Sequence, residues 1–381
     1  MPIQVIKKNE KYRAKFYYRD ENGNTTYGGS KTFVRRRDAE SWLQNQKDLF
    51  NSSGVTADKA NVPFTKYWLD WFETFRKPSL RPITADKWMN SYSVMQKFWG
   101  RTLLKNIDKR RYQEFINWYG ANHAKSSVEK VHVHAHAAVK YAFEEKQINR
   151  DFADRPNLVG TVGVPDAHKF LEEEDFVKLK DYTLLSMNAS NISRVMISVA
   201  IHTGARLSEI AGLTYDDFDF KKNIITVNKT FDFRDGGFGP TKNTQSNRKI
   251  DVDSKFMNYM HLIVKQLELK NKILKNDDSH INAQLGLVFY NQQFDQPPTS
   301  NALNNELRSI YKTLDIKKTE VSFHGIRHSH VSYLLANGID IKYISEREGH
   351  DSIATTLNTY SHILNRFKKE QISKVVALFE A

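Results

Sequence analysis

The sequence contains no cysteine among its 381 residues, and this absence excludes several kinds of site at once. Without thiols the chain has no disulfide framework, no thiol nucleophile and no cysteine-ligated zinc or iron–sulfur centre. No segment approaches the roughly 18 consecutive apolar residues that cross a bilayer, and the first residues, MPIQVIKKNEK, form no apolar signal-peptide run. We therefore expect a cytoplasmic protein without a membrane partner.

A nucleotide-binding GxxxxGK[ST] loop is also missing, because the stretch from Gly236 to Lys242 lacks the Gly-Lys pair and its spacing. The one histidine-rich segment holds His132, His134 and His136. On a helix these side chains point in three directions, and only His132 and His136 share a face. We expect partly packed imidazoles there rather than a metal site, and we expect no cofactor.

What the chain has in excess is positive charge. Lys and Arg number 57 against 44 Asp and Glu, a net charge of +13. Residues 1–60 hold twelve basic and seven acidic side chains, residues 61–165 hold seventeen and ten, and the remainder is nearly balanced. A generally basic surface would spread this excess evenly. Its concentration in the first 165 residues favours a nucleic-acid partner for that part of the chain.

The N-terminal residues 1–55 are typical of a small β-β-β-α module. Residues 11–18 alternate basic with aromatic or apolar side chains, the pattern of a half-exposed strand. Residues 20–24 contain the Asn-Gly pair favoured in hairpin turns. Thr25–Tyr27 and Lys31–Val34 are the next predicted strands, and the spacing of apolar residues predicts a helix from Arg37 to Phe50.

A polar linker at residues 51–62 precedes a helical segment at residues 63–155. Aromatic side chains recur at helical spacing from Phe64 to Phe75, and further helices are predicted at Thr84–Phe98, Asp108–Tyr119 and Ser126–Lys146. The segment has a net charge of about +7 over residues 61–165, so we expect a helical bundle with a basic face.

Residues 168–381 form the third predicted domain. Acidic residues near Leu171 mark a helix start, and helices follow to about Leu213. Strands are expected at Ile224–Asn228 and Arg248–Val252, and helical patterns return after Asn301 and end with Asn365–Glu380. The predicted fold is therefore multidomain α+β: a β-β-β-α module, a helical bundle and a mainly α domain with a small antiparallel sheet.

Four segments of this third domain combine basic, polar and phenolic residues in otherwise apolar surroundings. Arg206 follows a glycine break in an apolar helical run, where an arginine needs an anion, and Glu209 lies three residues further on. The other segments are Thr241-Lys242-Asn243 beside a turn, His324 and Arg327 at i and i+3, and Gly349-His350 ten residues before Tyr360.

These segments, in this order and at these spacings, resemble the motifs of the tyrosine recombinases, the site-specific DNA integrases. HTGARLSEIAGL resembles the family's first arginine box, HGIRHSH its His-x-x-Arg box, and the closing Gly-His…Tyr-Ser-His its nucleophile region. One departure is Glu348, which stands where the family usually has a leucine before Gly-His, so that packing there is expected to differ.

The resemblance implies a role for each matching residue. Tyr360 would be the nucleophile that forms a 3′-phosphotyrosyl intermediate, and Arg206 and Arg327 would clamp the phosphate. His324 would act as a base or hydrogen-bond donor, Lys242 as the general acid, and His350 as a further phosphate contact. General chemistry supports these roles independently of the resemblance. Cleavage of a phosphodiester without a metal needs fixed cations at the phosphate oxygens and a proton donor for the leaving oxygen.

The first two domains resemble the arm-binding and core-binding domains of temperate-phage and conjugative-element integrases. The resemblance implies binding of double-stranded DNA at arm and core sites, with contacts from Arg13, Lys15, Tyr17, Arg35 and Arg36. It also implies a homotetramer on synapsed DNA, strand exchange through a Holliday junction in the nucleoid of a bacterial host, and a DNA-bending host factor and an excisionase as further partners.

Other functions stay open on the sequence alone. A non-enzymatic DNA-binding regulator would bind specific sites without covalent capture. A metal-dependent nuclease would need converging carboxylates, and Asp216, Asp217 and Asp219 fit a turn better. A type IB topoisomerase would share the tyrosine chemistry but relax any plasmid. Tyr333 and Tyr343, the competing phenols, lie in apolar patterns typical of core. The amphipathic tail at residues 361–381 is expected to dock on a neighbouring protomer.

Overall fold

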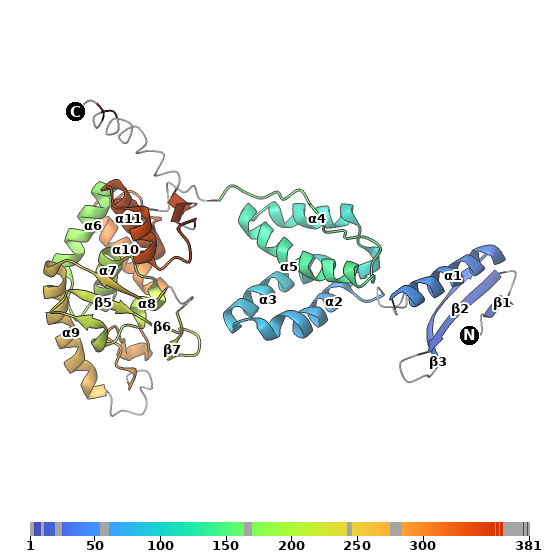
Figure 1. The fold of residues 1–381 in the computed structure, drawn as a ribbon, viewed down its shortest axis with the longest axis horizontal. Coiled ribbons are helices and arrows are strands. Elements are labelled where there is room, and N and C mark those ends of the chain that lie inside the picture. Colours follow the sequence, from blue (N-terminus) through green and yellow to red (C-terminus); the bar gives the residue numbers. More distant parts are fainter. Residues whose placement is uncertain are drawn as a thin grey trace. The chain divides into compact units, whose positions relative to one another are not determined.

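The fold is that of a computed structural model, in which residues 4–8, 11–19, 25–53, 61–163, 170–241, 246–274, 284–354, 356–357, 359–360, 376 and 379 are described. The chain divides into two compact units, Met1–Gly163 and Val164–Ala381 (Figure 1). The first unit holds a small αβ module and a helical bundle, each with its own apolar cluster, and the second is a mainly helical domain.

The N-terminal module is a three-stranded antiparallel sheet, β1 (Gln4–Lys8), β2 (Lys11–Arg19) and β3 (Thr25–Phe33), followed by helix α1 (Arg36–Ser53). The predicted β-β-β-α architecture is confirmed, but the division of the strands is wrong. The two short strands expected after residue 24 are one continuous strand, β3, in register with β2 except for a bulge at Phe16/Tyr17. The predicted Asn-Gly turn lies outside the described residues.

Glycine allows β3 to continue, because a Cβ on Gly28 would lie 2.5 Å from the ring of Phe16 on β2. Alternation along β2 sends Ala14 and Phe16 into a small core with Ala39 and Leu43 of α1. The intervening side chains therefore lie on the other face of the sheet; they are Lys11, Arg13, Lys15 and Tyr17.

The helical bundle consists of α2 (Phe64–Trp71), α3 (Pro82–Trp99), α4 (Lys109–Gly120) and α5 (Lys125–Glu144), as the apolar spacing predicted. Helix α2 continues as a π-helical segment, Phe72–Arg76, and a 3₁₀ turn, Lys77–Ser79. The core of the bundle is rich in aromatic rings, and Trp68 is fully buried in it. Trp68 stacks on both Phe72 and Trp88, which joins the start of the bundle to α3.

The three histidines of α5 are hydrogen bonded to side chains of the bundle. Nδ1 of His132 lies 3.0 Å from the hydroxyl of Tyr112, and Nδ1 of His134 lies 2.7 Å from Oγ of Ser91. His136 Nε2 contacts Asp151 at 2.7 Å. As predicted, His132 and His136 share a face, and their rings stack with centroids 5.3 Å apart. These contacts join α5 to α3, to α4 and to the segment that follows it.

The second unit surrounds its core with helices α6 (Glu173–Ser186), α7 (Ile192–Thr203), α8 (Leu207–Ala211), α9 (Ser254–Leu274), α10 (Ser300–Thr313), α11 (Phe323–Ala336) and α12 (Ile341–Glu348). A three-stranded antiparallel sheet has the order β4 (Phe218–Asp219), β5 (Ile224–Val227), β8 (Arg248–Asp251), and β6 (Thr230–Phe231) pairs with β7 (Phe238–Gly239). The predicted mainly α domain with a small sheet is confirmed. Helix α9 had no counterpart in the sequence prediction.

Two expectations on individual residues have opposite outcomes. Tyr333 packs on Phe176 in the core, as predicted. Tyr343 was expected in the core and is 47% exposed, so that prediction is wrong. It lies on α12, whose buried residues are Ile344, Ser345 and Glu348. The predicted helix at residues 365–380 and its docking lie almost wholly outside the described residues.

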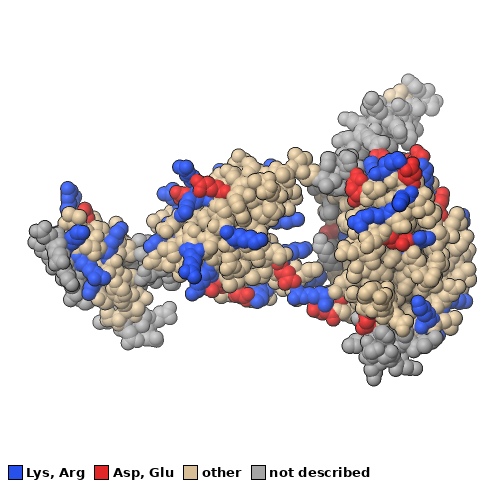
Figure 2. Space-filling view, turned by 180° about the vertical axis from the view of Figure 1, so that it is seen from behind, with Lys and Arg blue, Asp and Glu red and all other residues tan. Residues whose placement is uncertain are grey.

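The distribution of charge follows the sequence count. Figure 2 shows Lys and Arg side chains over the N-terminal module and the helical bundle on the face in view, with fewer Asp and Glu among them. Within the described part of the chain, no helix is long and apolar enough to cross a membrane.

Candidate active site

Arg206 is positioned by the break between two helices. Helix α7 ends at Gly204, whose φ of 68° is the left-handed conformation that favours glycine, and Arg206 then caps α8. The Glu209 carboxylate accepts hydrogen bonds from the Arg206 backbone N–H at 2.9 Å and from its guanidinium at 2.8 Å. This arrangement fixes a half-buried arginine whose side chain remains 24% exposed.

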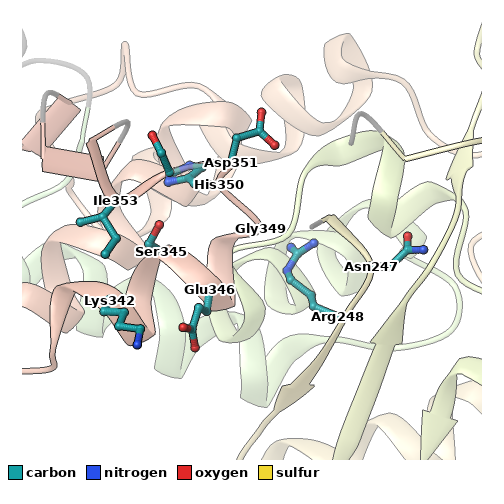
Figure 3. A pocket seen from close by; sticks show the side chains of 10 residues that line it. Asn247, Arg248, Lys342, Ser345, Glu346, Gly349, His350, Asp351 and Ile353 are labelled. Atoms are coloured by element: carbon teal, nitrogen blue, oxygen red, sulfur yellow. The ribbon is translucent and has the colours of Figure 1, made fainter. Parts of the chain in front are cut away.

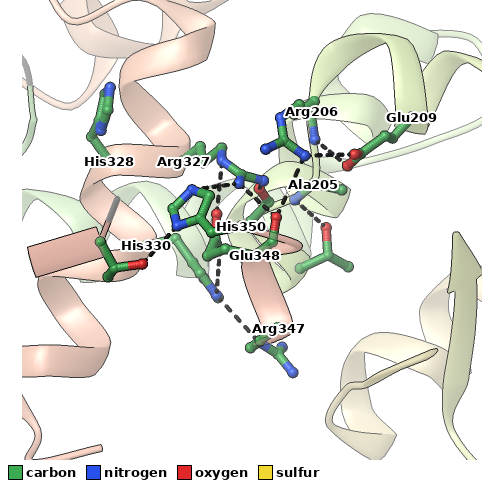
Figure 4. A network of polar contacts seen from close by, with 12 residues as sticks. Ala205, Arg206, Glu209, Arg327, His328, His330, Arg347, Glu348 and His350 are labelled. Atoms are coloured by element: carbon green, nitrogen blue, oxygen red, sulfur yellow. Dashed lines mark hydrogen bonds and ion pairs between the residues drawn. The ribbon is translucent and has the colours of Figure 1, made fainter. Parts of the chain in front are cut away.

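Arg327 lies on α11 and is almost completely buried, with 4% of its surface exposed. Its guanidinium donates to the backbone carbonyls of Gly204 at 2.8 Å and Glu348 at 2.6 Å, and it lies 3.1 Å from Nε2 of His350. Burial lowers the pKa of Arg327 below its usual value, and the Glu348 carboxylate opposes that shift. Two separate segments, one at Gly204 and the other at residues 348–350, therefore hold this side chain in one place (Figure 4).

Glu348, at the end of α12, is fully buried beside Arg327. Its Oε2 lies 2.7 Å from Nε of Arg327. Burial raises the pKa of Glu348 to about 7, and the positive charges of Arg327, Arg248 and Arg206 only partly offset that rise. The sequence marked Glu348 as unusual but did not predict that it contacts a candidate phosphate ligand.

A third arginine, Arg248 on β8, joins the cluster and was not among the predicted site residues. Its side chain is 7% exposed and donates to Oε2 of Glu209 at 3.0 Å. It also donates to the carbonyl of Arg347, next to Glu348. Burial alone would raise the pKa of Glu209, but Arg248 and Arg206 outweigh burial, so that the Glu209 pKa lies below its usual range. Glu209 therefore carries a negative charge that holds two arginines.

The two predicted histidines flank Arg327. His350 Nδ1 lies 2.7 Å from the Thr356 hydroxyl, and burial together with the nearby arginines lowers the His350 pKa to about 4. His324 lies one turn before Arg327 on α11. Partial burial of its ring lowers the pKa of His324, and Arg327 and Arg206 lower it further. Both imidazoles are therefore neutral at pH 7.

Tyr360 is the remaining residue of the cluster, and its side chain is 3% exposed. Its ring packs in a small apolar group with Val331, Leu335 and Ile344. Its hydroxyl lies 2.7 Å from Nδ1 of His328, on α11 beside Arg327. Burial raises the pKa of Tyr360, Glu348 raises it further, and Arg327 opposes them.

A pocket of about 460 Å³ opens beside the cluster, between β8 and α12 and the segment after α12 (Figure 3). Arg248 and His350 line it together with Asn247, Lys342 and Ser345. The lining also includes Glu346 and Asp351, so that two acidic side chains accompany the cations Arg248 and Lys342 in this polar pocket.

The structure thus brings five of the six predicted catalytic residues into one network around α11: Arg206, His324, Arg327, His350 and Tyr360. Lys242 lies outside the described residues. The predicted DNA contacts lie in the other unit, with Arg13, Lys15 and Tyr17 on β2 and Arg35 and Arg36 at the start of α1, where Arg36 pairs with Glu40 at 2.7 Å. Asp217 lies in the predicted turn, where its carboxylate accepts hydrogen bonds from the backbone N–H and the hydroxyl of Thr214 and pairs with Lys229.

Fixed guanidinium groups beside a buried phenol can bind a phosphodiester and present an oxygen nucleophile to it. Among the residues that the structure describes, no group of three or more His, Asp or Glu side chains could hold a metal ion.

Comparison with known proteins identifies the family of this chain. The family model described as "Phage integrase family" matches residues 169–366, and the chain belongs to that family. It is a tyrosine recombinase, an enzyme that cleaves and rejoins DNA in site-specific recombination.

The similar proteins include the integrase of Staphylococcus phage L54a, which is 28% identical over 81% of this chain and 91% of its own length. The ICEBs1 integrase of Bacillus subtilis is 29% identical over 54% of each chain. Among solved structures, the Tn1549 transposon integrase in complex with transposon right end DNA has a TM-score of 0.66 at 16% identity, covering 82% of this chain and 99% of that one. The last of these shows a shared fold.

Proposed function

We propose that this recombinase is the integrase of a mobile element, joining the element's attachment site to a site in a bacterial chromosome. Tyr360 would attack the scissile phosphate, while Arg206 and Arg327 bind its non-bridging oxygens. His324 and His350 would contact the same phosphate, and Lys242 would protonate the leaving 5′ oxygen. The observation that carries this proposal is the contact network around α11, which joins Arg206, Arg327, His350 and, through His328, Tyr360.

Each step balances without a cofactor. The Tyr360 oxygen bonds to phosphorus as the bond to the 5′ oxygen breaks, and the 3′-phosphotyrosyl ester keeps the energy of the broken bond for rejoining. Two arginines offset the charge that develops on the phosphate oxygens. Such electrostatic stabilisation of the transition state is the largest contribution to the rate that we expect in this kind of site. Exchange of one strand pair at a time would pass through a Holliday junction held by four protomers.

The N-terminal unit would supply site recognition. We assign arm-site binding to the module of residues 1–55, with Arg13, Lys15 and Tyr17 together on one face of β2 and Arg35 and Arg36 beside it. The bundle of residues 63–155 would bind core DNA, and the catalytic domain would begin at residue 168. A DNA-bending host factor and an excisionase would set the direction of recombination in the nucleoid.

A plasmid recombination assay tests this proposal. One plasmid carries the DNA that flanks this gene, joined end to end, and a second carries the matching chromosomal segment. We expect the wild type to fuse them in EDTA, and Tyr360→Phe to yield no fusion. Relaxation of plasmids without either site would indicate a topoisomerase instead, and binding without fusion or cleavage would favour a DNA-binding regulator.

A further inference from the structure

His328 has the contact that a proton acceptor for the nucleophile needs. Its Nδ1 lies 2.7 Å from the Tyr360 hydroxyl oxygen, a short hydrogen bond between residues 32 positions apart in the sequence. The ring planes are tilted by 57° with centroids 5.7 Å apart, so the rings are not stacked. When the neutral ring carries its proton on Nε2, Nδ1 accepts the phenolic hydrogen.

Tyr360 needs such an acceptor because of where it lies. The phenol is 3% exposed among apolar side chains, and its raised pKa means that the phenolate does not form by itself near neutral pH. A nucleophile of this kind is activated by a base within hydrogen-bond distance. The hydrogen bond that the described structure gives to Tyr360 is the one to His328.

His324 is the alternative base, and its position is different. Its ring meets the His328 ring edge to face, with centroids 5.0 Å apart, so that His328 lies in contact with both His324 and Tyr360. His324 also lies one turn before Arg327, and after burial the charges of Arg327 and Arg206 are what lower its pKa. This arrangement suits His324 to the phosphate and His328 to the phenol.

We propose that His328 is the catalytic residue that accepts the proton of Tyr360 during cleavage. The Tyr360 O–H bond breaks as its proton moves to Nδ1 of His328, and the phenolic oxygen forms the bond to phosphorus. The bond from phosphorus to the 5′ oxygen breaks, and that oxygen takes a proton from a separate acid. In rejoining, His328 returns its proton to the departing phenol. This inference rests on the proposed role of Tyr360 as the nucleophile.

The charged and titratable groups that face His328 come from several elements. His324 and Arg327 are on α11 itself, and His350, whose pKa His328 helps to lower, lies after α12. The charge of Glu348, at the end of α12, raises the pKa of the Tyr360 phenol. The arginines keep their charge from pH 5 to 9, whereas Glu348, with a pKa of about 7, also titrates in this range. The part of any rise in cleavage rate with pH that is lost in the His328 variants therefore measures proton acceptance by His328.

The test compares His328→Asn, His328→Ala and His324→Asn on a nicked duplex that the wild type cleaves. Asparagine places an oxygen near the position of Nδ1, so it keeps a hydrogen-bond acceptor but cannot hold the proton. We expect His328→Asn and His328→Ala to form the covalent adduct at least a hundredfold more slowly, with DNA affinity unchanged within about threefold. The rise of rate with pH should disappear in both variants and remain in His324→Asn.

A second substrate separates the two proton transfers. Replacing the scissile 5′ oxygen by sulfur gives a leaving group that needs no acid, and it should leave the defect of His328→Asn in place. Recovery on this substrate would mean that His328 serves the leaving group, which overturns the proposal. Full activity of His328→Asn beside an inactive His328→Ala would also overturn it, since His328 would then only position the phenol.

Thermal unfolding and DNA affinity of each variant show whether it is folded. If His328→Asn is unfolded, His328→Ala and the pH profile of the wild type on the sulfur substrate replace it, and a profile without a rise would overturn the proposal. Failure of the wild type itself to form an adduct would count against the proposed function. An adduct formed equally well without His328 would count against this inference alone.

Discussion

Oε2 of Glu348 lies 2.7 Å from Nε of Arg327, and both side chains are buried within the network of polar contacts around α11. The carboxylate contacts the inner edge of the guanidinium, while the backbone carbonyls of Gly204 and Glu348 accept from its two terminal nitrogens. Glu348 therefore helps to hold the Arg327 side chain in place. When ionised, it also places a buried negative charge next to a group that, in the proposed function, binds the phosphate.

The stability of the protein should depend on pH through Glu348. Its pKa in the folded state is about 7, above the ordinary 4.5, so folding favours the protonated carboxyl. The stability that this group contributes is complete below about pH 4.5 and is lost as pH rises through 7. Glu348→Gln cannot ionise, and from pH 5 to 8 its free energy of unfolding should gain up to about 3 kcal/mol relative to the wild type. Urea unfolding at several pH values measures this difference.

A difference that stays constant with pH would contradict this prediction, whatever its sign. Glu346→Gln, two residues away on the same helix and lining the pocket, is the matched control. We expect its unfolding free energy to follow that of the wild type at each pH.

Gly204 should be intolerant of any side chain. Its φ of 68° is strained for other residues, and a Cβ there would lie 2.0 Å from Oε1 of Glu348. Gly204→Ala should lower the free energy of unfolding by more than the roughly 1–2 kcal/mol of left-handed strain alone. Adduct formation should fall at least tenfold, because the Gly204 carbonyl binds Arg327.

The control is Gly286→Ala, at a nearly identical φ of 69° with nothing within 4 Å of the added Cβ. It should lose the strain energy only and keep the wild-type rate of adduct formation. Equal destabilisation by the two substitutions, measured by urea unfolding, would contradict the packing of Glu348 against Gly204.

Much of this architecture was predictable from the sequence, because the helices and strands follow local apolar spacing. The division of β3 was not, since Gly28 and Gly29 interrupt the local pattern while cross-strand pairing with Phe16 preserves the strand. Tyr343 was wrongly predicted to be in the core because its position around the axis of α12 decides whether its side chain faces the core. Residue type alone does not determine that position.

The same limit applies to the site. The motif residues could be predicted singly, each from its own segment. The pairing of Glu348 with Arg327 joins residues 21 positions apart, and that of Tyr360 with His328 joins residues 32 apart. Arg248 carries no motif in the sequence, and its role in binding Glu209 depends on the path of β8. Such contacts depend on tertiary structure and have no local signal.

The N-terminal module offers a test of DNA binding apart from catalysis. Arg13→Gln combined with Lys15→Gln removes two cations from the outer face of β2. If each contacts a phosphate, the dependence of log K on log salt for arm-site DNA should become shallower by about 2. Cleavage of a nicked core duplex should be unchanged, as fluorescence anisotropy and gel assays would show.

Lys272→Gln gives the matched control, since this lysine pairs with Glu268 on α9 in the other unit. It should leave the salt dependence of arm-site binding as it is in the wild type. An unchanged slope for the double variant would place arm recognition elsewhere than on β2.

The most direct test of the account is covalent capture by Tyr360. Nicked duplexes made from the DNA that flanks this gene are incubated in EDTA with the wild type, Tyr360→Phe and Tyr343→Phe, and then run on a denaturing gel. The account predicts a protein–DNA adduct for the wild type and for Tyr343→Phe, whose phenol is exposed on α12, and none for Tyr360→Phe. Peptide mapping should place the DNA on Tyr360. An adduct that survives Tyr360→Phe would contradict the central claim.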